Sequence, residues 1–210
     1  MDNGEVHRAG DAGGGVGLGA ADRNRSAVEP EKRGIGDEKL SYRPHNSAFS
    51  LQSVAPAAMV EAMDKTLSDI EKKYDMSIDQ FVTRELGYDS EEEMHRALAA
   101  EQVDSVAMAI HQMSQGYALI IGDQTGVGKG RQMAALIRWA VRQGKKPIFI
   151  TQNADLFSDI YRDLVDVGSG DLRPFIFNSD GAIVDSNGAV VHKPLSLSEQ
   201  TKIFASVLRV

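Results

Sequence analysis

The sequence predicts an α/β fold in which helices flank a parallel β-sheet. Apolar runs at residues 118–121, 147–150 and 174–177 have the length and composition of buried strands. The first two are each followed by a segment in which apolar residues recur at helical spacing. Strands and helices that alternate in this way form right-handed βαβ units, so we expect the strands to run parallel.

Length and composition set the class of protein. The chain has 210 residues, 42% of them hydrophobic, which suits one globular domain. A net charge of −7 argues against a wholly basic nucleic-acid-binding domain but leaves room for a local basic groove. The absence of cysteine excludes disulfides and thiolate metal sites, and no two histidines stand at i, i+4, so no metal site is predicted. No apolar run approaches about 18 residues and no secretory signal is seen, so we expect a cytoplasmic protein without a membrane span.

The first hundred residues divide by composition. Residues 1–40 are rich in glycine and charge and are expected to be a disordered tail. Residues 41–100 are expected to form an extended arm and a helical segment. Pro56 would open its first helix, and Ser77 and Ser90, each followed by Gln or Glu three residues later, would cap two more.

Residues 102–115 continue with a helix that has one apolar face. Gln102 lies at the edge of this face, and two interpretations of it remain open. It is either a polar residue at the boundary of the core or, roughly twenty residues before a glycine-rich loop, the residue that pairs with an adenine edge. A side-chain amide offers both the donor and the acceptor that such pairing needs.

The glycine-rich loop lies between the first apolar run and the next helix. Strand, glycine-rich turn, lysine and helix in this order are typical of a phosphate-binding loop, because glycines let several N–H groups face one anion. Thr125, Gly126, Gly128 and Lys129 fit the looser form typical of superfamily 2 helicases. Gly130 stands where Ser or Thr usually binds Mg²⁺, so another ligand or a water must take that position.

Beyond the loop, the segment 132–143 is expected to be an amphipathic helix. Arg131, Arg138 and Arg142 form a stripe on its polar face, which is either solvated or in contact with nucleic acid. Trp139, near the border of the apolar face, is either a packing residue or a base-stacking one. Residues 151–153 follow the second strand, at the same expected edge of the sheet as the loop.

The last forty residues lack an element that a phosphate-loop enzyme needs. Such enzymes place an acidic residue after an apolar strand to hold Mg²⁺ and position water. Asp185 follows a short apolar run, but residues 182–191 favour a hairpin, with Asn187 and Gly188 in its turn. We therefore expect residues 101–210 to be a truncated nucleotide-binding domain of a longer chain.

Three segments together resemble the strawberry notch family of helicase-like NTP hydrolases, in its bacterial and phage form. They are Leu98 to Asp104, Ile120 to Arg131 and Leu156 to Leu164. The family's loop also contains Gly-Val-Gly-Lys-Gly-Arg, which makes Gly130 a family trait. The resemblance covers residues 41–210.

The resemblance implies a RecA-like P-loop NTPase fold, of which this chain would hold an incomplete first lobe. It implies ATP and Mg²⁺ as cofactors and helicase-like activity on nucleic acid, DNA in preference to RNA. It makes Gln102 the adenine reader and Lys129 the catalytic residue, and it places Thr151 and Asn153 near a nucleic-acid strand. The implied nucleotide cradle consists of Thr125, Gly126, Val127, Gly128, Lys129, Gly130 and Arg131.

Two alternatives remain open at this point. The chain could be a module that binds nucleotide without turning it over, which the missing acidic residue favours for these residues alone. It could also be a small-molecule kinase with a divergent phosphate loop. The absence of Ser or Thr after Lys129 and of an arginine-rich lid argues against the kinase.

Overall fold

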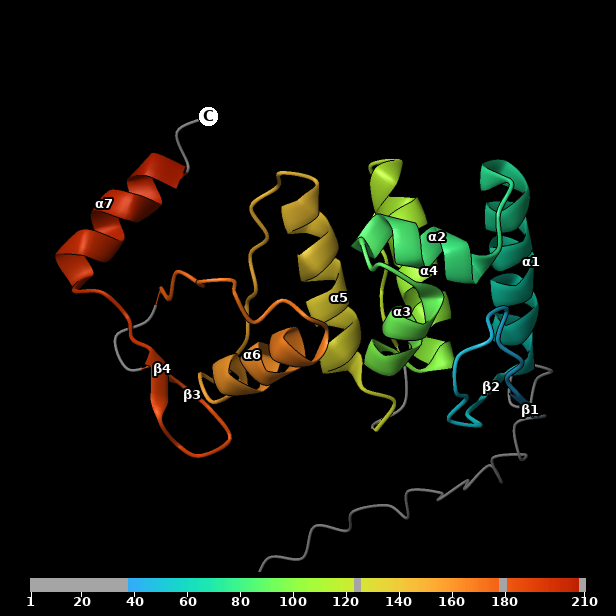
Figure 1. Ribbon diagram of the computed structural model, residues 1–210, viewed down its shortest axis with the longest axis horizontal. Helices are drawn as coiled ribbons and strands as arrows, with labels where there is room; N and C mark the ends of the chain where they lie inside the picture. The colour runs from blue at the N-terminus through green and yellow to red at the C-terminus, as the bar shows by residue number, and fades with distance from the viewer. Residues whose placement is uncertain (1–37, 123–125, 178–180, 208–210) are drawn as a thin grey trace, which may run out of the picture. The chain divides into compact units, whose positions relative to one another are not determined.

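The computed structural model describes residues 38–122, 126–177 and 181–207 (Figure 1). All of them belong to one compact unit, residues 34–210. The elements, in chain order, are β1 (Lys39–Ser41), β2 (Val54–Pro56), α1 (Ala57–Tyr74), α2 (Ile78–Leu86), α3 (Glu91–Ala97), α4 (Ala100–Ser114), α5 (Lys129–Arg142), α6 (Leu156–Asp166), β3 (Ile183–Val184), β4 (Val190–His192) and α7 (Leu197–Val207).

The helices begin where short polar side chains or proline predict them to begin. Pro56 precedes α1, and Ser77 forms a complete capping box with Gln80 at the start of α2. The hydroxyl of Ser90 accepts a hydrogen bond from the N–H of Glu93 in α3. These bonds satisfy N–H groups that have no partner inside a helix, so the predicted starts are confirmed.

The core gathers around α4, because one face of each neighbouring helix is directed at it. Residues 100–110 of α4 are all buried, and α1, α2 and α5 pack against this helix. The core continues through Trp139 of α5 to Ile160 and Leu164 of α6, which lies alongside α5. Of the two interpretations of Trp139, the structure supports packing: its ring is buried and its Nε1–H donates to Glu85.

The extended arm, residues 42–53, is fixed to the helices by three buried carboxylates. Asp104 accepts hydrogen bonds from Tyr42 Oη at 2.7 Å, from the N–H of His45 and from Asn46. Asp79 and Glu101 accept others, including those from the backbone N–H groups of residues 47, 51 and 53. Main-chain donors that lack a strand partner are thereby satisfied.

The predicted parallel sheet is not formed by the described residues. They form two antiparallel pairs, β1 with β2 and β3 with β4, and residues 118–121, 147–150 and 174–177 belong to neither. Ile120 is 93% exposed and Ile150 86% exposed. A strand that is apolar on both faces needs neighbours to pair its backbone and cover its side chains, and these runs have no such ladder among the described residues.

The predicted hairpin near the end of the chain is formed, by β3 and β4. The Oδ1 atom of Asp185 accepts hydrogen bonds from the N–H groups of Asn187 and Ala189, which closes the turn. Asp185 is therefore a turn residue in this structure.

Two further predictions can be compared only with the part of the chain that the structure describes. Of the predicted tail, residues 1–40, only 38–40 are described, and Lys39 and Leu40 belong to β1. In the described part of the chain, no helix has the length and apolar character needed to cross a lipid bilayer.

Candidate functional site: the loop before α5

The second half of the glycine-rich loop turns the chain into α5. Gly126 and Gly128 have φ of +101° and +81°, a region that side chains disfavour. Gly128 caps α5 without a side-chain bond, and Lys129 is its first residue. The first turn therefore presents backbone N–H groups and the positive end of the helix dipole, which is the geometry that binds a phosphate. Thr125, predicted to belong to the cradle, lies outside the described residues.

Gln102 ties α4 to this loop. Its Nε2 donates to the carbonyl oxygen of Val127 at 2.8 Å, and its Oε1 accepts from the N–H of Ala99 at 2.9 Å. A side chain at Gly128 would overlap Nε2 of Gln102, which is a second reason for glycine there. Further along, Ser105 donates to Gln132 at 2.8 Å and joins α4 to α5 again. Gln102 thus positions the loop, and each end of its amide keeps one further hydrogen-bonding capacity.

A hollow of about 260 Å³ opens beside the loop. The arm, the turn between α3 and α4, and the loop itself form its walls. Gln102 lines the hollow with Val127, and Phe49, 78% exposed, lines it from the arm. The remaining lining residues are Leu51, His95, Arg96, Ala97, Leu98, Ala99, Gly126 and Arg131. A hollow that combines apolar side chains with one amide, two arginines and one histidine, beside the glycine-rich loop, suits an aromatic base attached to phosphates.

Helix α6 brings a carboxylate to the first turn of α5. A Cβ at Gly130 would overlap the Oδ2 atom of Asp163 and lie 3.3 Å from its Cγ. Arg131, the next residue, forms an ion pair with Asp166 one turn further along α6. Burial raises the pKa of Asp163, against the lowering effect of Arg131 and Arg162.

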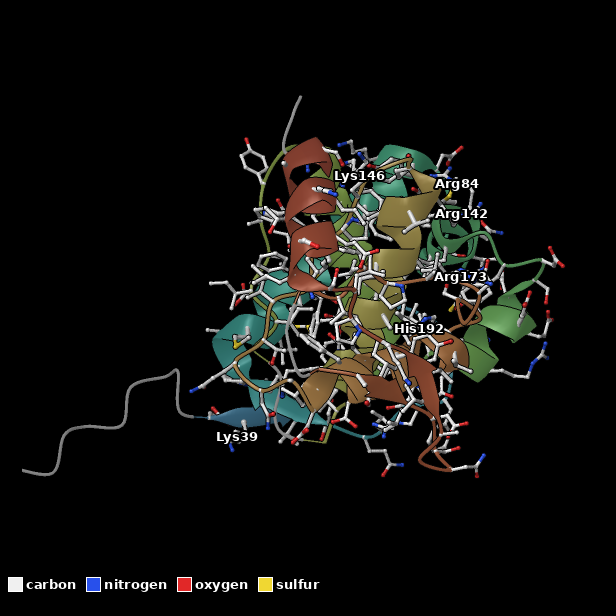
Figure 2. The ribbon with its side chains drawn as sticks, turned by 90° about the vertical axis from the view of Figure 1, so that its left-hand side faces the viewer. Lys39, Arg84, Arg142, Lys146, Arg173 and His192 are labelled. Atoms are coloured by element: carbon white, nitrogen blue, oxygen red, sulfur yellow. The ribbon has the colours of Figure 1, made fainter. Side chains whose placement is uncertain are left out.

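The arginine stripe of α5 is only partly a solvated face. Arg138 donates to the carbonyl oxygens of Leu86 at 2.8 Å and Val167 at 3.2 Å, so it joins the ends of α2 and α6. Its guanidinium also lies over the ring of Tyr88, 4.5 Å from the centroid. Arg142, seen on the same side as Arg84 in Figure 2, lies against Gly87 and is exposed.

The predicted nucleic-acid residues lie in the turn before α6. The N–H of Asn153 donates to Thr151 Oγ1 at 3.4 Å, and Oδ1 of Asn153 accepts from the N–H of Asp155 at 3.0 Å. Both predicted residues are accessible, Asn153 the more so. Their role in binding nucleic acid stays a prediction.

Two residues of the candidate site were not predicted from the sequence. Asp163 lies in a segment that carried the family resemblance, so the signal was present but had no assigned role. Phe49 lies in the arm, far from Gln102 along the chain, and only the fold brings the two to one hollow.

Comparison with known proteins agrees with this geometry. A family model described as P-loop containing NTP hydrolase pore-1 matches residues 55–184. The chain is 28% identical to "Protein strawberry notch homolog" of Caenorhabditis elegans over 162 residues, which are 76% of this chain and 8% of that protein. It is 30% identical to "Protein FORGETTER 1" of Arabidopsis thaliana over 159 residues, 70% of this chain and 11% of that protein.

A third relative, "Protein strawberry notch" of Drosophila melanogaster, is 31% identical over 149 residues, which are 68% of this chain and 8% of that protein. The chain thus spans only about a tenth of the length of the curated relatives that it matches. No solved structure matches it significantly. Because the family model covers more than half of the chain and includes the loop, Gln102 and α6, the protein belongs to the P-loop containing NTP hydrolase pore-1 family and is similar to the strawberry notch proteins.

Proposed function

We propose that the chain binds ATP, with its phosphates at residues 126–131 and its base in the hollow beside Gln102. The observation that carries this proposal is the pair of left-handed glycines that opens α5 while Gln102 holds the carbonyl of Val127. Lys129 supplies a positive charge next to the outer phosphates, and the helix dipole adds to it. Thr125, in the undescribed part of the loop, would complete the cradle.

The base is proposed to lie between Phe49 and the turn before α4. Aromatic stacking suits a purine ring, and Gln102 can use its second N–H and second lone pair for the adenine edge. The Gln102 amide would then contact both the base and the loop, because it already donates a hydrogen bond to the carbonyl oxygen of Val127.

Mg²⁺ is proposed to accompany the nucleotide. Among the described residues, no group of three or more His, Asp or Glu side chains could enclose a metal ion by itself. Mg²⁺ commonly takes one or two carboxylates together with phosphate oxygens and water, so a nearby carboxylate is sufficient. When bound, the ion neutralises charge on the phosphates.

In a longer protein of this family, we propose that ATP hydrolysis drives helicase-like movement on nucleic acid, with DNA preferred to RNA. A RecA-like parallel sheet is part of this proposal. Its strands would be residues 118–121, 147–150 and 174–177, which are mostly apolar and, apart from the buried Ile176 and the half-buried Ile121 and Phe149, exposed here. Thr151 and Asn153 would contact the nucleic acid, and further domains of the longer chain would supply the missing acidic residue.

The test of nucleotide binding is calorimetry with ATP on the wild type and Lys129→Ala. We expect the variant to bind at least about tenfold more weakly, a loss of about 1.4 kcal/mol, because one charge on the phosphates is removed. Lys146→Ala, in the exposed segment after α5 (Figure 2), is the matched control and should bind as the wild type does. Equal affinity of the Lys129→Ala variant and the wild type would remove the phosphate assignment.

Turnover separates a translocase from a module that only binds. ATP hydrolysis by a longer protein of the family is measured with and without single-stranded DNA, and then with RNA of the same length. Stimulation by DNA supports the helicase-like proposal. Binding without hydrolysis in either case supports the module instead.

A further inference from the structure

The structure shows what occupies the place of the missing hydroxyl at Gly130. Phosphate loops usually carry Ser or Thr at this position, and its hydroxyl binds the Mg²⁺ of the nucleotide. In this chain a side chain there would overlap Oδ2 of Asp163, so the carboxylate stands where the side chain would begin. A side chain at position 130 would therefore have to displace this carboxylate, and an oxygen donor is present at the first turn of α5 without one.

The position of Asp163 is set by helix packing. The neighbouring residue Leu164 is buried against α5, and Ile160 lies on the same buried face. The ion pair between Arg131 and Asp166 fixes the two helices one turn further on. Because both contacts belong to the packed interface of α5 and α6, the packing of the two helices places residue 163 beside Gly130.

The charges around Asp163 leave it suited to a cation. Arg131 and Arg162 are the positive groups that act on it, and Asp159 and Asp166 are the negative ones. Among the described residues, the side-chain carboxylate of Asp163 accepts no hydrogen bond and has no ion-pair partner within 4 Å.

We propose that the Asp163 carboxylate is the protein ligand of the Mg²⁺ that accompanies the nucleotide, in place of a hydroxyl at position 130. This inference rests on the proposed nucleotide site. A carboxylate oxygen is a hard donor of the kind that Mg²⁺ prefers. A carboxylate and a triphosphate at one helix N-terminus repel each other, and a divalent cation between them turns the repulsion into attraction.

The test compares nucleotide affinity in Mg²⁺ and in EDTA, by calorimetry with a non-hydrolysable ATP analogue. The wild type is expected to bind at least about tenfold more tightly in Mg²⁺. In Asp163→Asn, which keeps the size of the side chain, this ratio should fall close to one, and affinity in EDTA should be unchanged or higher. Asp159→Asn, a neighbouring acid one turn away that pairs with Arg162, should keep the wild-type ratio.

A second variant covers the case in which Asp163→Asn does not fold. Gly130→Ser combined with Asp163→Ala restores the usual hydroxyl and removes the carboxylate, and it should recover the dependence on Mg²⁺. A folded double variant without that dependence would overturn the equivalence of the two oxygen donors.

The remaining outcomes separate this inference from the proposed function. A wild-type ratio in folded Asp163→Asn, or a wild type whose affinity is the same in Mg²⁺ and EDTA, overturns the role of Asp163 and leaves nucleotide binding standing. A wild type that binds no nucleotide under either condition overturns the proposed function, and this inference with it.

Discussion

Phe49 is the residue whose position most needs an explanation, because an aromatic ring that is 78% exposed gains little from folding. The arm holds it at the hollow: Ser47 and Leu51, on either side, donate their N–H groups to buried Asp79 and Glu101. The N–H of Ala100 donates to the carbonyl oxygen of Phe49 at 2.9 Å, which fixes its backbone. A backbone held this firmly keeps an exposed ring ready for a ligand.

Replacement of Phe49 tests the proposed base site. Phe49→Ala should lower ATP affinity by about 1 kcal/mol or more, roughly fivefold, because stacking on the base is lost. The affinity for inorganic triphosphate should not change, since it has no base. Phe49→Tyr should bind ATP as the wild type does, and so should Phe175→Ala, which removes a partly exposed aromatic ring outside the hollow. If Phe49→Ala also lost affinity for inorganic triphosphate to a similar extent, the substitution would be acting on the glycine-rich loop and not on the base site.

At the scale of elements, the caps and apolar stripes specify the helices and the contacts between helices place the loop. Helix α5 is the centre of these contacts, because α2, α4 and α6 all pack on it. Arg138 joins two of them by donating to carbonyl oxygens that end α2 and α6, and Tyr88 donates its hydroxyl to Val167 at 2.9 Å. Burial raises the pKa of Tyr88 to about 12, so the phenol remains a hydrogen-bond donor at pH values at which an ordinary tyrosine ionises.

Removal of the Arg138 guanidinium should therefore loosen α2 and α6 from α5. We expect Arg138→Met to lower the free energy of unfolding by about 2–3 kcal/mol, because hydrogen bonds from a charged group to partly buried carbonyls are lost. Urea denaturation measures this change. Arg162→Met, which breaks an exposed ion pair with Asp159, should cost less than about 1 kcal/mol. Equal losses of unfolding free energy in the two variants would contradict the role of Arg138 in joining α2 and α6 to α5.

At the scale of the whole described unit, charged side chains attach the arm to the helices that carry the loop. His45 contacts Asp64 through Nε2 at 2.8 Å and Glu71 through Nδ1 at 3.6 Å. Burial of the ring lowers its pKa, but these acids and Asp104 outweigh burial, so the pKa lies above its ordinary value of 6.5. The protonated ring thus helps to hold the arm against α1.

This contact gives the protein a pH dependence with a definite sign. Above pH 6.5 the folded state binds more protons at His45 than the unfolded state does, so stability should fall as pH rises through the folded pKa. His45→Asn should remove this slope in thermal unfolding between pH 6.5 and 8. His111 is the control: burial and Lys73 lower its pKa, so it acts below pH 6.5 and with the opposite sign. A slope that persists in His45→Asn would contradict the assignment.

The sequence by itself determined the helices, the starts of α1, α2 and α3, the hairpin and the place of the glycine-rich loop before α5. These features depend on neighbours within a few residues, such as Ser77 with Gln80 or Gly128 before Lys129, and local chemistry is visible in order along the chain. It also pointed to Gln102, although the bond of that residue to Val127 needed the structure.

Only the tertiary structure decided which distant residues share the site. Phe49 reaches the hollow because buried carboxylates hold the arm, and Asp163 reaches Gly130 because α6 packs on α5. The predicted sheet illustrates the same dependence on distant contacts. Residues 118–121 have the composition of a strand, but a strand pairs only with a neighbouring segment, which no local sequence pattern supplies. Contacts between residues far apart in sequence depend on the packing of whole elements, which is why the chain alone could not assign them.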